Sequence, residues 1–405
     1  MQHQLSHEQL EQIAHDYGTP VYVYHAEKIK EQYEKLQHAF TGVNTRFFYA
    51  AKALTNINIL KYINSLGCHI DCSSINEVKL AIRAGYIPGN ILYTSSNISF
   101  EEIEEAKTLG VHINIDSISN LEKFAKKFGE SYPVGIRLRP NIMAGGNLKI
   151  STGHNSSKFG IPPEQIKNIT GLVNETGLVI RTLHIHTGSE IKDVEVFAKG
   201  IEVLFEIAKH FPLLEVIDLG GGFKVPYLPG EEGTDIELLG KKVKEEFDWY
   251  EKTYHKKLQV WFEPGKYLVS EAGYFITKVN VVKPAGDILF AGVNSGLNHF
   301  IRPMFYGAYH EIENISNPGA EKRKYNVVGN ICETDTFAED RLLPEVREGD
   351  FLVFRNAGAY GFEMSSNYNS RFKPAEVMVE EDKARLIRRK EVMDDLLSGQ
   401  IELIS

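Results

Sequence analysis

The chain has 405 residues, of which 42% are hydrophobic and 24% are charged, a composition typical of a globular protein long enough for two hydrophobic cores. Its formal net charge of −9 argues against a nucleic-acid partner, because polyanions are bound through basic surfaces. No apolar run approaches the about 18 residues that a membrane span needs, and the polar N-terminus lacks a secretory signal. The three cysteines (Cys68, Cys72 and Cys332) are sparse and odd in number, so we expect reduced thiols, a cytoplasmic protein and no metal site.

The first predicted element is a helix, which Ser6 and Gln9 open as a capping box and which Gly18 ends. A strand follows at Val21–Tyr24, and strands then alternate with amphipathic helices to about residue 266. Eight strands are expected in this part, at Phe47–Ala51, His69–Ser73, Ile91–Thr94, His112–Asp116, Val134–Leu138, Thr182–His186, Val216–Leu219 and Val260–Glu263. Capping-box pairs are expected to open three of the helices, at Ser74/Glu77, Ser99/Glu102 and Ser119/Glu122.

This alternation predicts an α/β fold, with a (β/α)8 TIM-type barrel at residues 25–270. An open doubly wound sheet is the alternative, which is disfavoured because no Gly-x-Gly-x-x-Gly follows the first strand. After Glu271 the pattern changes, and we expect a mainly β C-terminal domain at residues 271–405, joined by the N-terminal segment 1–24. Its expected strands are Tyr274–Val282, Ile288–Val293, Tyr325–Val328, Phe351–Phe354 and Glu376–Val379, followed by a helix at Glu391–Leu397.

Lys52 lies at the carboxyl end of the apolar run that precedes it, where a barrel strand would deliver its ammonium to the active-site face. A lysine in such a place is costly unless it is paired or used. One use is a Schiff base with pyridoxal 5′-phosphate (PLP), which needs a partly desolvated amine. The alternative is a lysine that extends its ammonium to water.

The last three barrel strands also end in residues that suit a cofactor site. Gly220–Gly222 would let the backbone approach a phosphate, to which Ser189 could donate, although both also suit ordinary turns. Glu263 beside a pyridine nitrogen would keep it protonated and make the ring a strong electron sink, unless the carboxylate only forms a salt bridge. His186 could stack on the ring, whereas His184 suits a packed core histidine equally well.

Two further segments of the C-terminal region contain candidate residues. Cys332, between an apolar residue and Glu333, suits a proton donor or acceptor, but an inert cysteine is the simpler interpretation. Arg302, among apolar neighbours, suits binding of a carboxylate, with a surface ion pair as the alternative.

Taken together, these motifs resemble the fold-type III PLP-dependent amino-acid decarboxylases, and most closely those members that act on meso-diaminopimelate. The resemblance covers nearly the whole chain. It is carried by Tyr49–Ala53, Gly220–Gly222, Glu263–Gly265, Arg302–Tyr306, Cys332–Glu333 and Gly358–Arg371.

The resemblance implies a role for each matching residue. Lys52 would bind the cofactor covalently, His186 would lie on its ring and Glu263 would pair with its nitrogen. The phosphate region would be held by Ser189, Gly220, Gly221, Gly222, Glu263, Pro264, Gly265 and Tyr360. Cys332 would donate a proton, and the substrate would be bound by Lys266, Arg302, Tyr306, Glu333 and Tyr360. A homodimer is also implied, in which Cys332 and Glu333 reach into the partner's site.

The sequence departs from the common family pattern at three positions. Lys266 stands in place of an arginine that helps to bind the distal carboxylate, so the charge is kept and the bidentate fork is lost. Asn294 replaces a usual aspartate and Asn330 a usual proline.

The expected reaction is decarboxylation of meso-2,6-diaminopimelate to L-lysine and CO2, the last step of lysine biosynthesis. Cations such as Arg302 and Lys266 suit the second carboxylate of this substrate, which ornithine and lysine lack. The alternatives are decarboxylation of another basic amino acid (ornithine, lysine or carboxynorspermidine) on the same fold, and a non-catalytic PLP-binding regulatory homologue.

Overall fold

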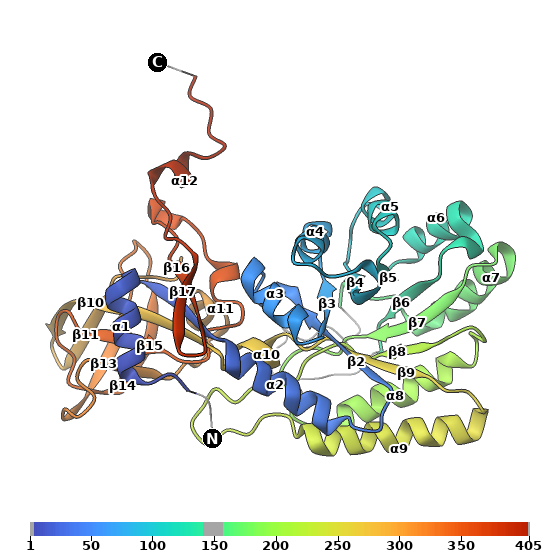
Figure 1. Cartoon of the computed structure of the whole chain (residues 1–405), viewed down its shortest axis with the longest axis horizontal. Coiled ribbons are helices and arrows are strands. Elements are labelled where there is room, and N and C mark those ends of the chain that lie inside the picture. Colours follow the sequence, from blue (N-terminus) through green and yellow to red (C-terminus); the bar gives the residue numbers. More distant parts are fainter. Residues whose placement is uncertain (1–3, 141–156, 404–405) are drawn as a thin grey trace. The chain divides into compact units, whose positions relative to one another are not determined.

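A computed structural model describes residues 4–140 and 157–403 of the chain (Figure 1). The chain divides into two compact units. The barrel unit comprises Lys30–Val225 and Glu232–Leu268, and the sheet unit comprises Met1–Ile29, Pro226–Glu231 and Val269–Ser405. None of the helices in the described part of the chain is both long and apolar enough to cross a membrane.

The barrel unit is a closed parallel barrel, which confirms the predicted (β/α)8 architecture. Its strands pair in chain order, and the last pairs with the first. They are β2 (Thr45–Ala50), β3 (His69–Cys72), β4 (Ile91–Thr94), β5 (His112–Ile115), β6 (Val134–Leu138), β7 (Ile180–Ile185), β8 (Val216–Asp218) and β9 (Gln259–Phe262). The helices of this unit are α2 (Ala26–Ala39), α3 (Ile57–Ser65), α4 (Ile75–Arg83), α5 (Phe100–Leu109), α6 (Ile118–Phe128), α7 (Ile166–Thr176), α8 (Glu195–Ala208), α9 (Ile236–Tyr254) and α10 (Lys266–Val269).

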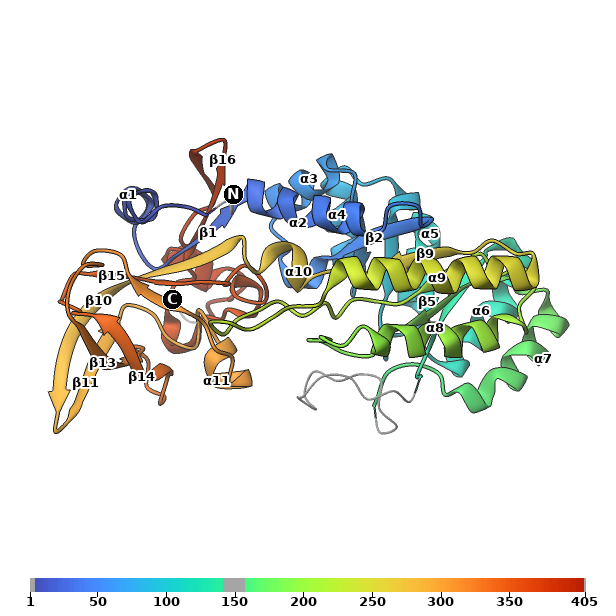
Figure 2. The ribbon, with the colours of Figure 1, turned by 90° about the horizontal axis from the view of Figure 1, so that it is seen from below.

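Apolar side chains from several strands fill the barrel. Phe48, Leu92, Val216 and Trp261 form one buried cluster, contributed by β2, β4, β8 and β9. Helices α8 and α9 lie side by side on the outside of the barrel (Figure 2). Because all eight strands are parallel, their carboxyl ends meet at one face, where the predicted site residues follow their strands.

The predicted helix starts are correct where the serine side chain caps the expected amide. Ser6 and Gln9 form a complete capping box, at the start of α1 (His7–Tyr17). Ser74 and Ser99 accept hydrogen bonds from the amides of Glu77 and Glu102, but neither glutamate returns the second bond to its serine.

The predicted Ser119/Glu122 cap is wrong. Ser117 caps α6 instead, accepting from the amide of Asn120, and Ser119 lies inside the helix. Strand β5 ends at Ile115, so the first serine after it is already in position to cap.

The sheet unit contains the mainly β part of the chain. Its strands are β1 (Val21–His25), β10 (Gly273–Ala285), β11 (Ile288–Val293), β12 (Ile312–Asn314), β13 (Lys322–Val328), β14 (Thr336–Pro344), β15 (Phe351–Phe354), β16 (Ala375–Glu380) and β17 (Lys383–Arg388). Strand β1 pairs antiparallel with β10 and parallel with β16, which places the N-terminal strand inside this sheet. Two short helices, α11 (Arg302–Tyr306) and α12 (Met393–Leu397), also belong to this unit.

The sequence did not predict β12, β14 and β17. Strand β17 is mostly exposed, and β14 buries its residues without alternation, so neither has the period-two pattern that marks a half-buried strand. The core of the unit is a cluster of buried apolar side chains that includes Val21, Val23, Ile276, Val353 and Val377.

Candidate active site

Lys52 lies in a short 3-10 turn, η1 (Ala51–Ala53), immediately after β2 rather than within a strand. Its Nζ atom is 3.0 Å from Oδ2 of Asp71, which β3 supplies at the same face of the barrel. The Lys52 side chain is 40% exposed, whereas the Asp71 side chain is 1% exposed. The amine therefore reaches the surface of the site while its counterion is buried.

The carboxyl of Asp71 is a poor acid in this position. Burial and then the charge of Glu263 raise its pKa to about 7, although the Lys52 ammonium favours ionisation. With a pKa near neutrality, the ionised Asp71 carboxylate, 3.0 Å from the amine, can accept a proton from it.

Glu263 follows β9 and is buried with His184 and Asp218. Its Oε1 atom is 3.3 Å from Nε2 of His184. Burial opposes ionisation of Glu263, but the nearby His184 and the Lys52 ammonium hold the pKa of its carboxyl well below the usual range. The three side chains offer donor atoms within 4.8 Å of one another, a separation that would also suit a metal ion. The site thus contains a buried anion at the carboxyl end of β9.

The glycine turn after β8 is fixed against β9 and against His186. The amide of Glu263 donates to the carbonyl of Gly220 over 2.8 Å, and the amide of Gly221 donates to Nδ1 of His186 over 3.2 Å. A Cβ on Gly221 would lie 2.2 Å from the carbonyl oxygen of Glu263, so only glycine fits there. Burial and the neighbouring Arg137 lower the pKa of His186 to about 3, which leaves the ring neutral.

The loop that follows β7 packs against the same glycine turn. The amide of Ile191 donates to the carbonyl of Gly222 over 2.8 Å, and a Cβ on Gly222 would lie 2.3 Å from the carbonyl of Gly188. Ser189, in this loop, is half-buried. Lys266, at the start of α10, pairs with the next residue of the loop, since its Nζ is 2.8 Å from Oε1 of Glu190.

The barrel residues fit PLP. A partly exposed amine stands near a buried carboxylate held in its ionised form, and the adjacent turn is built of glycines that admit no side chain at Gly221. These are three features that the cofactor requires, namely an amine for its aldehyde, an anion for its ring nitrogen and a glycine turn that lets the backbone come close to its phosphate. Lys52, His186, Ser189, Gly220–Gly222 and Glu263 all belong to the barrel unit.

The other predicted residues lie in the sheet unit, where Arg302 opens α11. Arg302 is 5% exposed, and its Nε is 3.3 Å from Nε2 of His310. Its guanidinium lies 5.4 Å from the ring centroid of Tyr227 and 5.8 Å from that of Tyr306. Among the described residues, no carboxylate lies within ion-pairing distance of this guanidinium. Arg302 is therefore a buried cation without an acidic partner in the described chain, not a surface ion pair.

Cys332 is an exposed free thiol, held by two neighbours from a later loop. Nδ2 of Asn369 donates to its sulfur over 3.1 Å, and the hydroxyl of Tyr368 lies 3.4 Å from the sulfur. The same hydroxyl donates to Oε1 of Glu333 over 2.8 Å. Hydrogen bonds from Tyr368 and Asn369 lower the pKa of the thiol, against the opposing charge of Glu333. Tyr360, the remaining predicted residue, is half-buried with a left-handed backbone at φ 55°.

Sequence reasoning missed several residues of these clusters, namely Asp71, Arg137, Asp218, Tyr368 and Asn369. The signal for Asp71 and Asp218 was present, because both lie at the carboxyl ends of predicted strands, as Lys52 and Glu263 do. For Tyr368 and Asn369 no periodicity could have given the signal, since they lie in the turn η6 (Tyr368–Ser370). Cys68 and Cys72 are buried.

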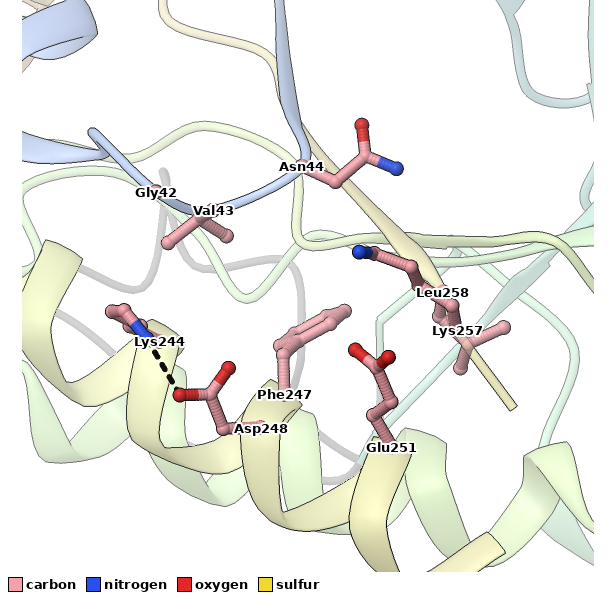
Figure 3. A pocket seen from close by; sticks show the side chains of 9 residues that line it. All are labelled: Gly42, Val43, Asn44, Lys244, Phe247, Asp248, Glu251, Lys257 and Leu258. Atoms are coloured by element: carbon pink, nitrogen blue, oxygen red, sulfur yellow. Dashed lines mark hydrogen bonds and ion pairs between the residues drawn. The ribbon is translucent and has the colours of Figure 1, made fainter. Parts of the chain in front are cut away.

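A cavity of about 280 Å³ lies elsewhere on the barrel unit (Figure 3). It is lined by residues that precede β2 and β9, including Asn44 and Lys257, and by one face of α9, including Phe247. These residues belong to the amino ends of the strands, so this cavity is not part of the Lys52 cluster.

Comparison with known proteins gives a consistent result. Residues 26–270 match the family model described as pyridoxal-dependent decarboxylase, pyridoxal binding domain. The diaminopimelate decarboxylase of Methanothermobacter thermautotrophicus is 40% identical over 399 residues, which cover 96% of this chain and 93% of that protein. The crystal structure of the Helicobacter pylori diaminopimelate decarboxylase, complexed with L-lysine, has a TM-score of 0.87 at 33% identity and covers 96% of this chain and 98% of that one. The crystal structure of the diaminopimelate decarboxylase from M. jannaschii has a TM-score of 0.88 at 30% identity and covers 96% of this chain and 94% of that one.

Proposed function

The chain belongs to the pyridoxal-dependent decarboxylase family, and from this membership we propose that it converts meso-2,6-diaminopimelate to L-lysine and CO2, with PLP as cofactor. The relatives named diaminopimelate decarboxylase, at 31–40% identity over nearly the full length, support this substrate. The reaction would complete lysine biosynthesis.

The observation that carries the choice of substrate is the buried Arg302. A guanidinium that is 5% exposed and has no acidic partner among the described residues is costly, unless a ligand supplies a carboxylate. The distal carboxylate of meso-diaminopimelate supplies one, and ornithine and lysine do not. We assign Arg302 and Tyr306 to this carboxylate. Lys266 would assist, in competition with Glu190.

When bound, PLP supplies a conjugated ring that accepts the electron pair released as the α-carboxylate leaves. Lys52 provides the amine that holds the cofactor, and Asp71 takes up the proton that this amine must lose to become nucleophilic. Glu263, kept as an anion, would hold a proton on the ring nitrogen, and His186, as a neutral imidazole, would lie against the ring. The phosphate would be held by Ser189, Gly220, Gly221, Gly222, Pro264, Gly265 and Tyr360.

Cys332 would return the proton to the α-carbon after CO2 has left. Its thiol is exposed, and its lowered pKa makes it a better acid than an ordinary cysteine. Glu333 would bind the distal ammonium of the substrate.

We further propose a cytoplasmic homodimer in which Cys332 and Glu333 complete the site of the partner subunit. The exposure of both side chains in the single chain supports this arrangement. We also propose that residues 25–270 form the PLP-binding domain and that residues 271–405, with segment 1–24, form the second domain. The family match at residues 26–270 supports this division.

The test is to load the protein with PLP, add meso-diaminopimelate and measure L-lysine and CO2 in equal amounts. Ornithine and lysine are the matched controls, because they carry the same two amines without the second carboxylate. Turnover of ornithine with no lysine formed would replace the proposed substrate. No turnover of any of the three, with PLP bound, would favour a non-catalytic homologue.

A further inference from the structure

The buried carboxyl group of Asp218 lies beside Glu263 and is not among the predicted cofactor residues. Asp218 ends β8 and is fully buried, as is His184 on β7, and Glu263 beside them is 6% exposed. Asp218 directly precedes the glycine turn, separated from it by Leu219. It thus links the turn to the carboxylate on the next strand.

The hydrogen bonds of this cluster are incomplete in a specific way. Oδ1 of Asp218 accepts from the amide of Gly220 over 3.0 Å. Its Oδ2 has no hydrogen-bond partner among the described residues, and the same holds for Oε1 of Glu263. The carboxylates of Asp218 and Glu263 and a nitrogen of His184 lie within 4.8 Å of one another. Two buried carboxyl groups therefore lie close together, and each has one oxygen that accepts no hydrogen bond from the described residues. Nε2 of His184 lies 3.3 Å from Oε1 of Glu263, within ion-pairing distance.

A proton on one of the two carboxyls resolves this arrangement. Two carboxylates this close, both out of water, cannot both stay ionised, and such pairs share one proton. The negative charge is favoured on Glu263, because the Lys52 ammonium and the nearby Nε2 of His184 stabilise its ionised form. Burial and then Glu263 itself raise the pKa of the Asp218 carboxyl well above its usual range. Asp71 adds a further opposing charge, and Arg137 a favourable one.

We propose that Asp218 is a neutral carboxylic acid at physiological pH, whose Oδ2–H donates to the carboxylate of Glu263 and fixes both its charge and its orientation. Asp218 is then a positioning residue that acts through Glu263. It accepts from the glycine turn on one oxygen and donates to Glu263 with the other. The position of the predicted phosphate site is thereby fixed relative to the carboxylate predicted to bind the ring nitrogen. The consequence for the cofactor rests on the proposed function, whereas the location of the proton does not.

The proton can be located by infrared spectroscopy of the PLP-loaded protein and of the cofactor-free protein, with 13C-labelled aspartate side chains. We expect a protonated carboxyl band that persists at pH 8.5 and disappears in Asp218→Asn. Asp71→Asn is the matched control, because the Asp71 carboxyl, with a pKa of about 7, contributes a protonated band only toward lower pH. Absence of the band from the wild type at pH 8.5, or its survival in Asp218→Asn, would overturn the proposal.

The variants Asp218→Asn and Asp218→Ala test whether Asp218 acts as a neutral hydrogen-bond donor or as an anion. Asn keeps an acceptor for the Gly220 amide and a donor for Glu263, so Asp218→Asn should keep PLP affinity within about twofold, whereas Asp218→Ala should weaken it about tenfold. The absorbance of bound PLP should keep its wild-type pH dependence only in Asp218→Asn. Equal loss of PLP affinity in both variants would show that the negative charge of Asp218 is required and would overturn the proposal.

A bound metal ion is the other outcome that would overturn the proposal, since these side chains are metal donors as well. Elemental analysis would reveal it as one equivalent of a tightly bound metal. Because infrared detection needs no substrate, it stays informative if the chain proves to act on another amino acid.

Discussion

The two clusters of candidate catalytic residues differ in how their charges are controlled. In the barrel unit, Asp71, His184 and Asp218 are buried at the ends of rigid strands. In the sheet unit, Cys332, Glu333, Tyr368 and Asn369 are all exposed and lie in loops and turns. Burial is the first cause of the pKa shifts in the barrel cluster, whereas hydrogen bonds are the first cause at Cys332.

This difference indicates that charges interact more strongly in the barrel cluster than in the Cys332 cluster. The buried charges of the barrel cluster interact strongly because water is excluded, and β-strands fix their geometry. The Cys332 cluster is open to solvent, which weakens its electrostatic interactions until another surface covers it. The barrel cluster should therefore control cofactor binding, and the Cys332 cluster should control proton transfer in the proposed dimer.

The largest effect is expected from Lys52→Ala. Loss of the amine should abolish the characteristic absorbance of bound PLP and lower kcat by a factor of about a thousand or more, because no other described side chain of the cluster offers an amine near Asp71. Absorbance spectra of the PLP-loaded protein and steady-state kinetics measure this. Lys52→Arg is the matched control, since it keeps a cation for Asp71 but cannot bind the aldehyde in the same way. An unchanged spectrum in Lys52→Ala would remove this residue from the site.

Cys332→Ala should have a smaller effect, confined to turnover. We expect kcat to fall about a hundredfold, which is typical for loss of a proton donor, with PLP absorbance unchanged. Cys68→Ser is the matched control, because that thiol is buried before β3 and donates to the carbonyl of Phe47. Wild-type kcat in Cys332→Ala would exclude the thiol from proton transfer.

How far the sequence could predict these clusters depends on what positions each residue. Lys52 and Glu263 were predictable, because a residue that follows a parallel strand is placed by the strand itself. The pairing of Lys52 with Asp71 was not, since strand ends give a shared face but not which side chains touch. The barrel itself was predictable from the alternation of strands and helices, because many residues along the chain contribute to that pattern.

Local features with few determinants were less predictable. Ser117 and Ser119 both suit a helix cap, and the end of β5 decides between them, which no local pattern reveals. The exposed strand β17 carries no burial pattern because it has little to bury. Tyr368 and Asn369 reach Cys332 through a turn with left-handed backbone at Asn369, so their contact depends on tertiary structure.

The smallest effect is expected from Tyr368→Phe, and it concerns pH rather than rate. The hydrogen bond between the Tyr368 hydroxyl and Cys332 lowers the pKa of the thiol. Removing it should raise that pKa. A thiol that donates a proton is active below its pKa, so the loss of kcat at alkaline pH should shift to higher pH in the variant. Tyr254→Phe, at an exposed tyrosine at the end of α9, is the control. A shift toward lower pH would show that Tyr368 favours the thiol instead, and no shift would show that Cys332 does not set the alkaline limit. Only the absence of a shift would reassign the proton donor, and the role of the buried barrel cluster in cofactor binding would stand in either case.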